Sequence, residues 1–211
     1  MPSTKRAAPP ANRLLAALPK KEYQRLLPQL EHVPLTFGDI LFEPGETLRH
    51  VYFPNDSHIS LLSTVDDREL LEVGMAGNEG MAGLSVFMGV NKSSNRGLVQ
   101  GAGTAMKMKA ATLRKEASNN SSLNKLLLRY THSFLTQVSQ SAACNRFHVV
   151  NARLARWLLM THDRVEGNEF RLTQEFLSHM LGVRREGVTL AAGVLTETKA
   201  HQLQSRDNQD S

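Results

Sequence analysis

The chain has 211 residues, of which 41% are hydrophobic and 21% charged, and this composition predicts a mostly soluble, globular protein. The apolar run LLAAL at residues 14–18 is too short for a membrane span or a signal peptide, so we predict a cytoplasmic protein with no membrane partner. Cys144 is the only cysteine, which excludes an intramolecular disulfide bond and a cysteine-ligated iron–sulfur cluster. The net charge of +5 is only a weak indication of an anionic partner.

The first predicted elements in chain order are a tail, a helix and a set of strands. Residues 1–11 are rich in Pro, Ala and Lys and are expected to be disordered, and residues 12–30 are expected to form a short helix interrupted by Pro19 and Pro28. From residue 32 to 108, short segments rich in Val, Leu and Phe are separated by turn signals such as Pro44-Gly45. Many short strands at regular spacing predict a sandwich, barrel or jelly roll.

A long helix is predicted from residue 118 to 145, because its apolar residues recur at spacings of three and four. They form one stripe, made of Leu123, Leu126, Leu127, Tyr130, Phe134 and Val138. Two interpretations of this stripe are open. It packs on the barrel of its own chain, or it pairs with the same helix of a second copy.

The segment LTQEFLSHMLGVRREGVTLAAGVL, from Leu172 to Leu195, contains two helical patterns that meet at Gly182. Thr173 is a suitable N-cap for the first helix, and Gly182 can adopt the left-handed conformation that ends it. The residues expected to face inward are Leu177, Leu181, Val188 and Ala191. This pattern predicts a helix-turn-helix motif.

The second helix of this pair carries its charges, Arg184, Arg185 and Glu186, bunched in its first turn. In a helix-turn-helix motif that turn enters the major groove of DNA, where Arg can donate two hydrogen bonds to guanine and Glu can accept one from cytosine. The alternative interpretation is an ordinary helical hairpin with a charged turn that faces solvent. The pattern by itself does not decide between the two.

The order of barrel, long helix and helix-turn-helix resembles the Crp/Fnr family of bacterial transcription regulators. The stretches that carry the resemblance are NRLLAALP, GDILFEPGE, HVYFP, EVGMAGNEGMAGL, ARLARWLLM and LTQEFLSHMLGVRREGV. The resemblance implies an α+β fold with an N-terminal jelly roll of the cyclic-nucleotide-binding type at 12–117. It also implies a dimerisation helix at 118–145 and a helix-turn-helix domain at 146–195.

The resemblance assigns roles to individual residues. Arg184, Arg185 and Glu186 fall where family members read base edges, while Leu190 stands where a further polar reader is frequent. Contacts to the DNA backbone are expected from Thr173, Gln174 and Thr189. Because DNA half-sites mirror protein symmetry, we favour a homodimer whose interface is formed by Leu123, Leu127, Tyr130, Phe134 and Val138.

The cyclic-nucleotide site of the family is not preserved. Family members use a Gly-Glu pair for the ribose and an Arg-Ser or Arg-Thr pair for the phosphate, whereas this chain has Ala82-Gly83 and Asn95-Arg96 near those places. The ribose carboxylate is missing unless Glu79 substitutes for it. We therefore expect no cofactor and no cyclic AMP or GMP. A pocket at Glu79, Ala82, Gly83, Asn95 and Arg96 would hold a different small effector or none.

The end of the chain departs from the family as well. Family members continue into a β-hairpin, the wing, whereas residues 196–211 lack apolar alternation and contain no Gly or Pro. We expect a disordered tail here, and hence an incomplete winged helix with an atypical or truncated wing. Loss of the wing would remove some of the salt-dependent affinity for DNA.

Three functional classes compete. The first is a homodimeric, sequence-specific regulator that binds double-stranded DNA, with RNA polymerase as a further expected partner. The second is a dimeric sensor or interaction module that has lost DNA binding with the wing. The third, a metalloenzyme of the jelly-roll type, is disfavoured because His32, His50 and His58 lack the spacing that aims several ligands at one metal ion. With no catalytic motif found, we predict the first class and no enzyme.

Overall fold

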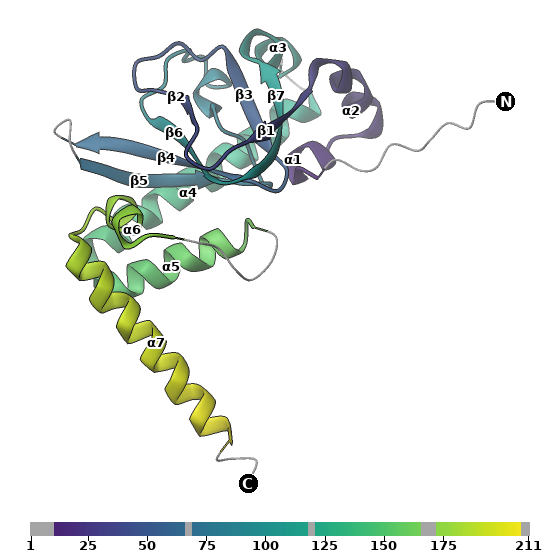
Figure 1. Ribbon diagram of the computed structural model, residues 1–211. Coiled ribbons are helices and arrows are strands. Elements are labelled where there is room, and N and C mark those ends of the chain that lie inside the picture. Colours follow the sequence, from purple (N-terminus) through teal and green to yellow (C-terminus); the bar gives the residue numbers. More distant parts are fainter. Residues whose placement is uncertain (1–10, 66–68, 118–120, 166–171, 208–211) are drawn as a thin grey trace.

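The computed structural model describes residues 11–65, 69–117, 121–165 and 172–207 (Figure 1). The chain begins with α1 (Arg13–Ala16), α2 (Lys20–Leu26) and the 3-10 turn η1 (Leu27–Gln29), so the predicted helix interrupted at its prolines is confirmed. The strands are β1 (Glu31–Leu35), β2 (Ile40–Phe42), β3 (His50–Pro54), β4 (His58–Val65), β5 (Glu69–Ala76), β6 (Arg96–Gly101) and β7 (Gly103–Lys109), with the 3-10 turn η2 (Leu84–Val86) between β5 and β6. The later helices are α3 (Ala110–Glu116), α4 (Ser122–Phe147), α5 (Val150–His162), α6 (Gln174–Leu181) and α7 (Arg185–Asp207).

The strands form two antiparallel sheets that face each other as a jelly roll. One sheet has the order β1-β7-β3 and the other has the order β2-β6-β4-β5, so strands distant in sequence lie side by side. Strand β4 shows the period of two that this packing requires. Ile59 and Leu61 pack into the barrel core, whereas Ser60 and Leu62 face the C-terminal helices. The predicted α+β fold with an N-terminal jelly roll is confirmed.

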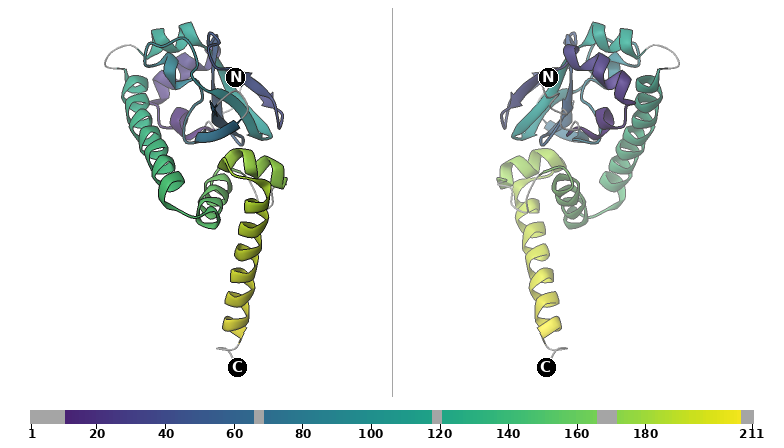
Figure 2. Two further views of the ribbon diagram at one scale, coloured as in Figure 1. Left: turned by 90° about the vertical axis from the view of Figure 1, so that its left-hand side faces the viewer. Right: turned by 90° about the vertical axis from the view of Figure 1, so that its right-hand side faces the viewer.

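The helix α4 packs along the side of the barrel (Figure 2). It begins where Ser121 caps it by accepting a hydrogen bond from the backbone of Asn124. Leu123 and Leu127 are fully buried in the barrel core, and Tyr130 is 8% exposed. The prediction that these three residues form a dimer interface is therefore wrong, because their apolar surface is already covered by their own chain.

The rest of the predicted interface is partly covered as well. Phe134 packs against the same barrel core, and its ring lies 6.1 Å from that of Tyr130. Val138 is half-buried on the flank of α4. Helix α4 instead exposes Leu128 and Leu135, at 56% and 59% of their surface. The stripe of the sequence pattern is thus the side of the helix that faces its own chain.

The three C-terminal helices pack on the barrel through a second core. Leu62 of β4 and Met75 of β5 share this core with Trp157 of α5, Met180 of α6 and Val188 of α7. The sheet β2-β6-β4-β5 is therefore apolar on both faces, as expected of a sheet buried on both sides. Helix α6 lies directly on β5 (Figure 1).

Helix α7 continues well past the helix-turn-helix segment and projects away from the rest of the molecule (Figure 2). The disordered tail predicted for residues 196–211 is wrong as far as Asp207, and residues 208–211 lie outside the described part of the chain. The reason is that residues 196–207 contain no helix breaker and include Glu, Lys, Ala, Gln and Leu, which propagate a helix that has already started. The predicted tail at 1–10 also lies outside the described residues.

Candidate functional site

The two helices α6 and α7 meet in a well-formed helix-turn-helix. Thr173 caps α6 by accepting a hydrogen bond from the backbone of Phe176 at 3.1 Å, as predicted from the sequence. Gly182 ends the helix in the left-handed conformation, with φ 59° and ψ 46°, and its N–H donates to the carbonyl of His179. Leu177, Leu181, Val188 and Ala191 are all buried, as the pattern predicted.

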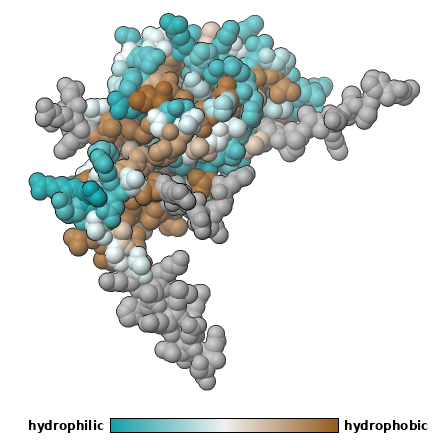
Figure 3. Space-filling view, in the orientation of Figure 1, coloured by the Kyte–Doolittle hydropathy of each residue, from teal (hydrophilic) through white to brown (hydrophobic). Residues whose placement is uncertain are grey.

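The first turn of α7 presents Arg184, Arg185 and Glu186 to solvent. Within the described residues, none of their side chains forms an ion pair with the chain itself. Hydrophilic side chains gather over the α6–α7 turn (Figure 3). Leu190, one turn further along α7, is 73% exposed and presents an apolar surface on the same helix. These charges are therefore free to meet a polar partner.

The residues predicted to contact the DNA backbone lie beside this turn. Gln174 and Thr189 are hydrogen bonded to each other, with the Thr189 hydroxyl donating to Oε1 of Gln174 at 2.9 Å. Both residues and Thr173 are exposed. The pair joins the start of α6 to α7, so the three polar side chains and the charged turn form one continuous polar face.

The residues predicted to form an effector pocket do not come together. Gly83 and Asn95 line a cavity of about 150 Å³, whose other walls are mostly apolar. Arg96 is instead paired with Glu43 at 2.8 Å, and Ala82 is fully buried, with its backbone paired to that of Tyr52. The prediction that these five residues line one pocket is therefore wrong. The remaining cavity is also below the several hundred Å³ that is typical of small-molecule sites.

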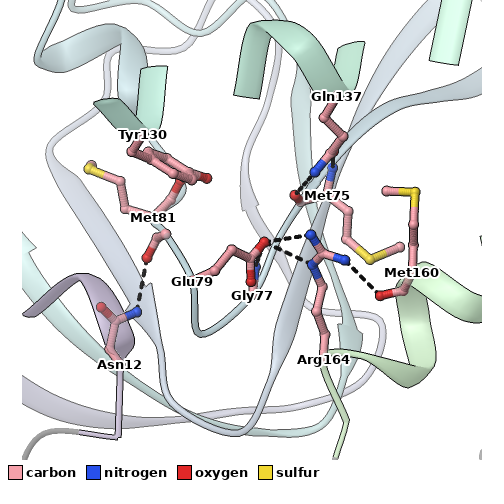
Figure 4. Close-up of polar contacts among 10 residues, drawn as sticks. Asn12, Met75, Gly77, Glu79, Met81, Tyr130, Gln137, Met160 and Arg164 are labelled. Atoms are coloured by element: carbon pink, nitrogen blue, oxygen red, sulfur yellow. Dashed lines mark hydrogen bonds and ion pairs between the residues drawn. The ribbon is translucent and has the colours of Figure 1, made fainter. Parts of the chain in front are cut away.

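The last predicted pocket residue, Glu79, lies at the junction between the barrel and α5. Its Oε1 atom accepts hydrogen bonds from Nε and Nη2 of Arg164, at 2.9 and 2.6 Å (Figure 4). Arg164 also donates to the carbonyl of Met160, and its side chain is only 11% exposed. A charge-assisted pair of this kind ties the end of α5 to the barrel.

The turn that carries Glu79, residues 77–80, and the residues that flank it are held by the start of α1 and by α4. The Asn12 amide donates to the carbonyls of Gly80 and Pro54, and the Tyr130 hydroxyl donates to the carbonyl of Met81. Gln137 of α4 both donates to and accepts from the backbone of Met75 (Figure 4). Sequence reasoning missed this junction. The one available signal was GNEG, because glycines in a turn often mark a close approach of other parts of the chain.

Two titratable groups lie buried between the barrel and the C-terminal helices. Burial raises the pKa of the Glu72 carboxyl to about 7, against smaller lowering contributions from Ser60, Trp157, Arg164 and Gln100. The Ser60 hydroxyl donates to Glu72 at 2.5 Å. The buried indole N–H of Trp157 lies near the carboxylate without a hydrogen bond of good geometry. Burial, and then the charge of Arg164, lower the pKa of His58 to about 4.

No three His, Cys, Asp or Glu side chains converge as metal ligands among the described residues. Over the same residues, no helix is long and apolar enough to cross a membrane. His58, one of the histidines weighed as a metal ligand, is buried at the barrel surface beside Gly101.

Comparison with known proteins shows which domain and which folds this structure is similar to. Residues 152–207 match the model of the Crp-like helix-turn-helix domain. No curated protein matches the chain. Among solved structures, the chain is similar to a regulator of the Crp/Fnr family from Eubacterium rectale, with a TM-score of 0.70 at 14% identity over 89% of this chain and 88% of that one.

Two further structures have the same architecture. FixK2 from Bradyrhizobium japonicum gives a TM-score of 0.69 at 14% identity, over 81% of this chain and 86% of that one. The c-di-GMP-responsive global regulator CLP from Xanthomonas campestris gives a TM-score of 0.65 at 18% identity, over 88% of this chain and 94% of that one. At these identities the similarity establishes the fold, and the helix-turn-helix match adds the domain family. The chain therefore has the fold of Crp/Fnr-type regulators, and its residues 152–207 form a domain that matches the Crp-like helix-turn-helix family.

Proposed function

We propose that the protein is a homodimeric, sequence-specific DNA-binding regulator that reads the major groove with the first turn of α7 and responds to a signal other than cyclic AMP. The observation that carries this proposal is the exposed group Arg184, Arg185 and Glu186 at the start of α7, behind a helix-turn-helix whose cap and turn are fully formed. A solvated hairpin would not need three charges concentrated at this end.

The chemistry of the reading follows from the side chains. The planar guanidinium of Arg184 or Arg185 can donate two parallel hydrogen bonds to O6 and N7 of guanine, and Glu186 can accept from the amino group of cytosine. Thr173, Gln174 and Thr189 carry neutral polar groups that suit phosphate contacts and fix the register of the helix. In a two-fold dimer, the two reading turns would lie roughly 34 Å apart, one turn of DNA.

Replacing Arg185 with alanine is expected to weaken binding to the preferred site by about 1–3 kcal/mol, because one bidentate base contact is lost. The preferred site is first obtained by selection of bound duplexes from a random pool and sequencing. Affinity of the two proteins is then compared on that site and on a scrambled duplex, across a series of salt concentrations.

The matched control is Lys92→Ala, which removes an exposed positive charge from the loop between η2 and β6. It should leave the affinity for the selected site unchanged. An equal loss for Arg185→Ala on every duplex would reduce Arg185 to a phosphate contact. Failure to recover any preferred sequence would contradict the proposal as a whole.

The dimer is proposed to use the free face of α4. Leu128, Leu135 and Ala142 follow each other at seven-residue spacing and are all exposed, which is the seam expected of two paired helices. This seam is separate from Leu123, Leu127 and Tyr130, which pack on the barrel. The sequence pattern alone pointed to the wrong side because the barrel-facing stripe is the more apolar of the two.

Leu135→Ala is expected to weaken the dimer by about tenfold or more, since each copy loses most of one buried leucine side chain. Sedimentation equilibrium over a range of protein concentrations measures the effect. Val90→Ala, at a residue that is similarly exposed but lies beyond η2, should leave self-association unchanged. A monomer at all concentrations, or a dimer unaffected by the change at Leu135, would overturn the proposed seam.

The second candidate function is a dimeric sensor that does not bind DNA. It is favoured by one observation, that residues 196–207, where the family resemblance implies the wing, continue helix α7 instead of forming strands. The two candidates differ in the DNA selection. Weak binding that ignores sequence and disappears at moderate salt is the result expected of the sensor. The proposed partnership with RNA polymerase depends on the first candidate.

A further inference from the structure

A second cavity, of about 450 Å³, opens between α1, α4 and the end of α5. Its lining includes the charged residues Arg13, Arg129, Arg164 and Glu79 and the apolar residues Leu126 and Phe134. The ring of Phe134 lies between this cavity and the smaller one at Asn95, since it lines both. The cavity is also outside the group of residues that the sequence predicted as an effector pocket, except for Glu79.

The charges of this cavity are unbalanced. Three guanidinium groups line it against one carboxylate, and that carboxylate is already paired with Arg164 at 2.6 Å. The other two arginines, Arg13 and Arg129, are exposed and form no ion pair within the described residues. The cavity therefore carries net positive charge and has unused hydrogen-bond donors.

The walls of the cavity are held firmly in place. The Asn12 side chain is fully buried and bonded to two carbonyls, and the Arg13 N–H donates to the carbonyl of Asn78 at 2.6 Å. On the opposite wall, Tyr130 and Gln137 anchor α4 to the barrel. The arginines thus project from fixed backbone, which lowers the entropy cost of binding a ligand between them.

We propose that this cavity binds a small organic phosphate. The planar guanidinium forms paired hydrogen bonds with phosphate oxygens, so Arg13 and Arg129 supply the natural partners of a phosphate dianion. The volume falls in the range of small-molecule sites, and Leu14, Leu126 and Phe134 offer an apolar surface for the organic part. The inference extends the proposed function, because it supplies the signal to which the regulator responds.

The position of Arg164 gives such a ligand a means to act on the DNA-binding helices. A phosphate in the cavity competes with Glu79 for the Arg164 guanidinium, and that ion pair ties α5 to the barrel. Weakening the pair shifts the balance between docked and released positions of the C-terminal helices. The cavity lies off the Leu128–Leu135 seam, so it stays open in the proposed dimer.

Isothermal titration of the full chain, without DNA, tests the site directly. The probes are AMP and glucose 6-phosphate, with adenosine, glucose and inorganic phosphate as controls at matched ionic strength. We expect at least one organic phosphate to bind more tightly than inorganic phosphate, and the two neutral compounds not to bind. Because no DNA is present, the outcome is independent of whether the protein reads a DNA sequence.

Three variants define the site further. Arg129→Gln should weaken binding about tenfold, since one charged hydrogen-bond donor is lost. Glu79→Gln should strengthen binding, because it removes the competing carboxylate and leaves Arg164 available to the ligand. Lys125→Gln removes an exposed positive charge one turn away on the same helix and outside the cavity lining, and should have no effect.

The proposal is overturned if neither organic phosphate binds at millimolar concentration. It is overturned as well if binding is unaffected by Arg129→Gln, or if inorganic phosphate binds as tightly as both esters, which would leave a site for a bare anion only. Weaker binding by Glu79→Gln would contradict the competition for Arg164.

Discussion

Replacing Glu72 with glutamine is expected to give the protein a stability that rises more steeply with pH between about 4.5 and 6.5 than that of the wild type. The reason is that two buried groups oppose each other. The pKa of Glu72 is raised to about 7 from an ordinary 4.5. The contribution of Glu72 to the stability of the fold is therefore fully present below pH 4.5 and is lost as the pH rises through 7.

The contribution of His58 to stability changes with pH in the opposite direction. Its pKa is lowered to about 4 from an ordinary 6.5, so its contribution is fully present above pH 6.5 and is lost as the pH falls through 4. Each group contributes a slope of about 1.4 kcal/mol per pH unit in the free energy of unfolding, and the two slopes cancel where they overlap. Removing Glu72 leaves the slope of His58 without its opposing term, a difference from the wild type of about 3 kcal/mol over the window.

Urea denaturation at a series of pH values measures these slopes. His58→Gln is the matched variant, because it leaves only Glu72 and should give a stability that falls with rising pH over the same window. The glutamine side chain introduced in each variant is neutral at every pH, so neither variant gains a new titrating group. Parallel pH profiles for the wild type and both variants would contradict the assignment of these two groups as the source of the pH dependence.

Gly80→Ala is expected to destabilise the protein by about 3 kcal/mol, because the added methyl group overpacks the junction beneath α4. A Cβ atom at this position would lie 2.0 Å from Cε2 and 2.1 Å from Cζ of Tyr130. The ring of Tyr130 cannot move aside easily, since it is buried and its hydroxyl donates to the carbonyl of Met81 at 3.0 Å. Chemical denaturation gives the change in the free energy of unfolding.

The same substitution elsewhere provides the control. Gly193 lies within α7 and has no atom within 4 Å of the position that a Cβ would take. Gly193→Ala should therefore stabilise the protein slightly, by about 0.5–1 kcal/mol, through the higher helix propensity of alanine. If Gly80→Ala changes the free energy of unfolding by the same sign and amount as Gly193→Ala, the ring of Tyr130 does not exclude a side chain at position 80.

The two substituted residues, Glu72 and Gly80, lie where helices pack on the barrel. Glu72 lies on the outer face of the barrel sheet, among side chains of α5 and α6, and the turn at Gly80 is contacted by α1 and α4. Phe176 of α6 contacts Phe37 of the barrel with ring centroids 5.6 Å apart. The helix-turn-helix is thus packed on the barrel, and a change at the barrel surface alters the balance between its positions.

The sequence by itself determined the local elements of this protein. Thr173, Gly182 and the spacing of Leu177, Leu181 and Val188 identified the helix-turn-helix, because caps, turns and helical faces depend on residues a few positions apart. The strand-rich region from residue 32 to 108 was likewise located by its composition and turns. The same absence of Gly and Pro that excluded a hairpin after residue 195 is what allows α7 to continue.

Only the tertiary structure decided which partners these elements meet. An apolar stripe on α4 requires burial but does not say against what, and the barrel of the same chain covers Leu123 and Leu127 while leaving Leu135 exposed. The pairing of Glu79 with Arg164 joins residues 85 positions apart. Such contacts arise from how the barrel and the C-terminal helices dock, and this geometry is set by the shapes of two packed surfaces rather than by any local pattern.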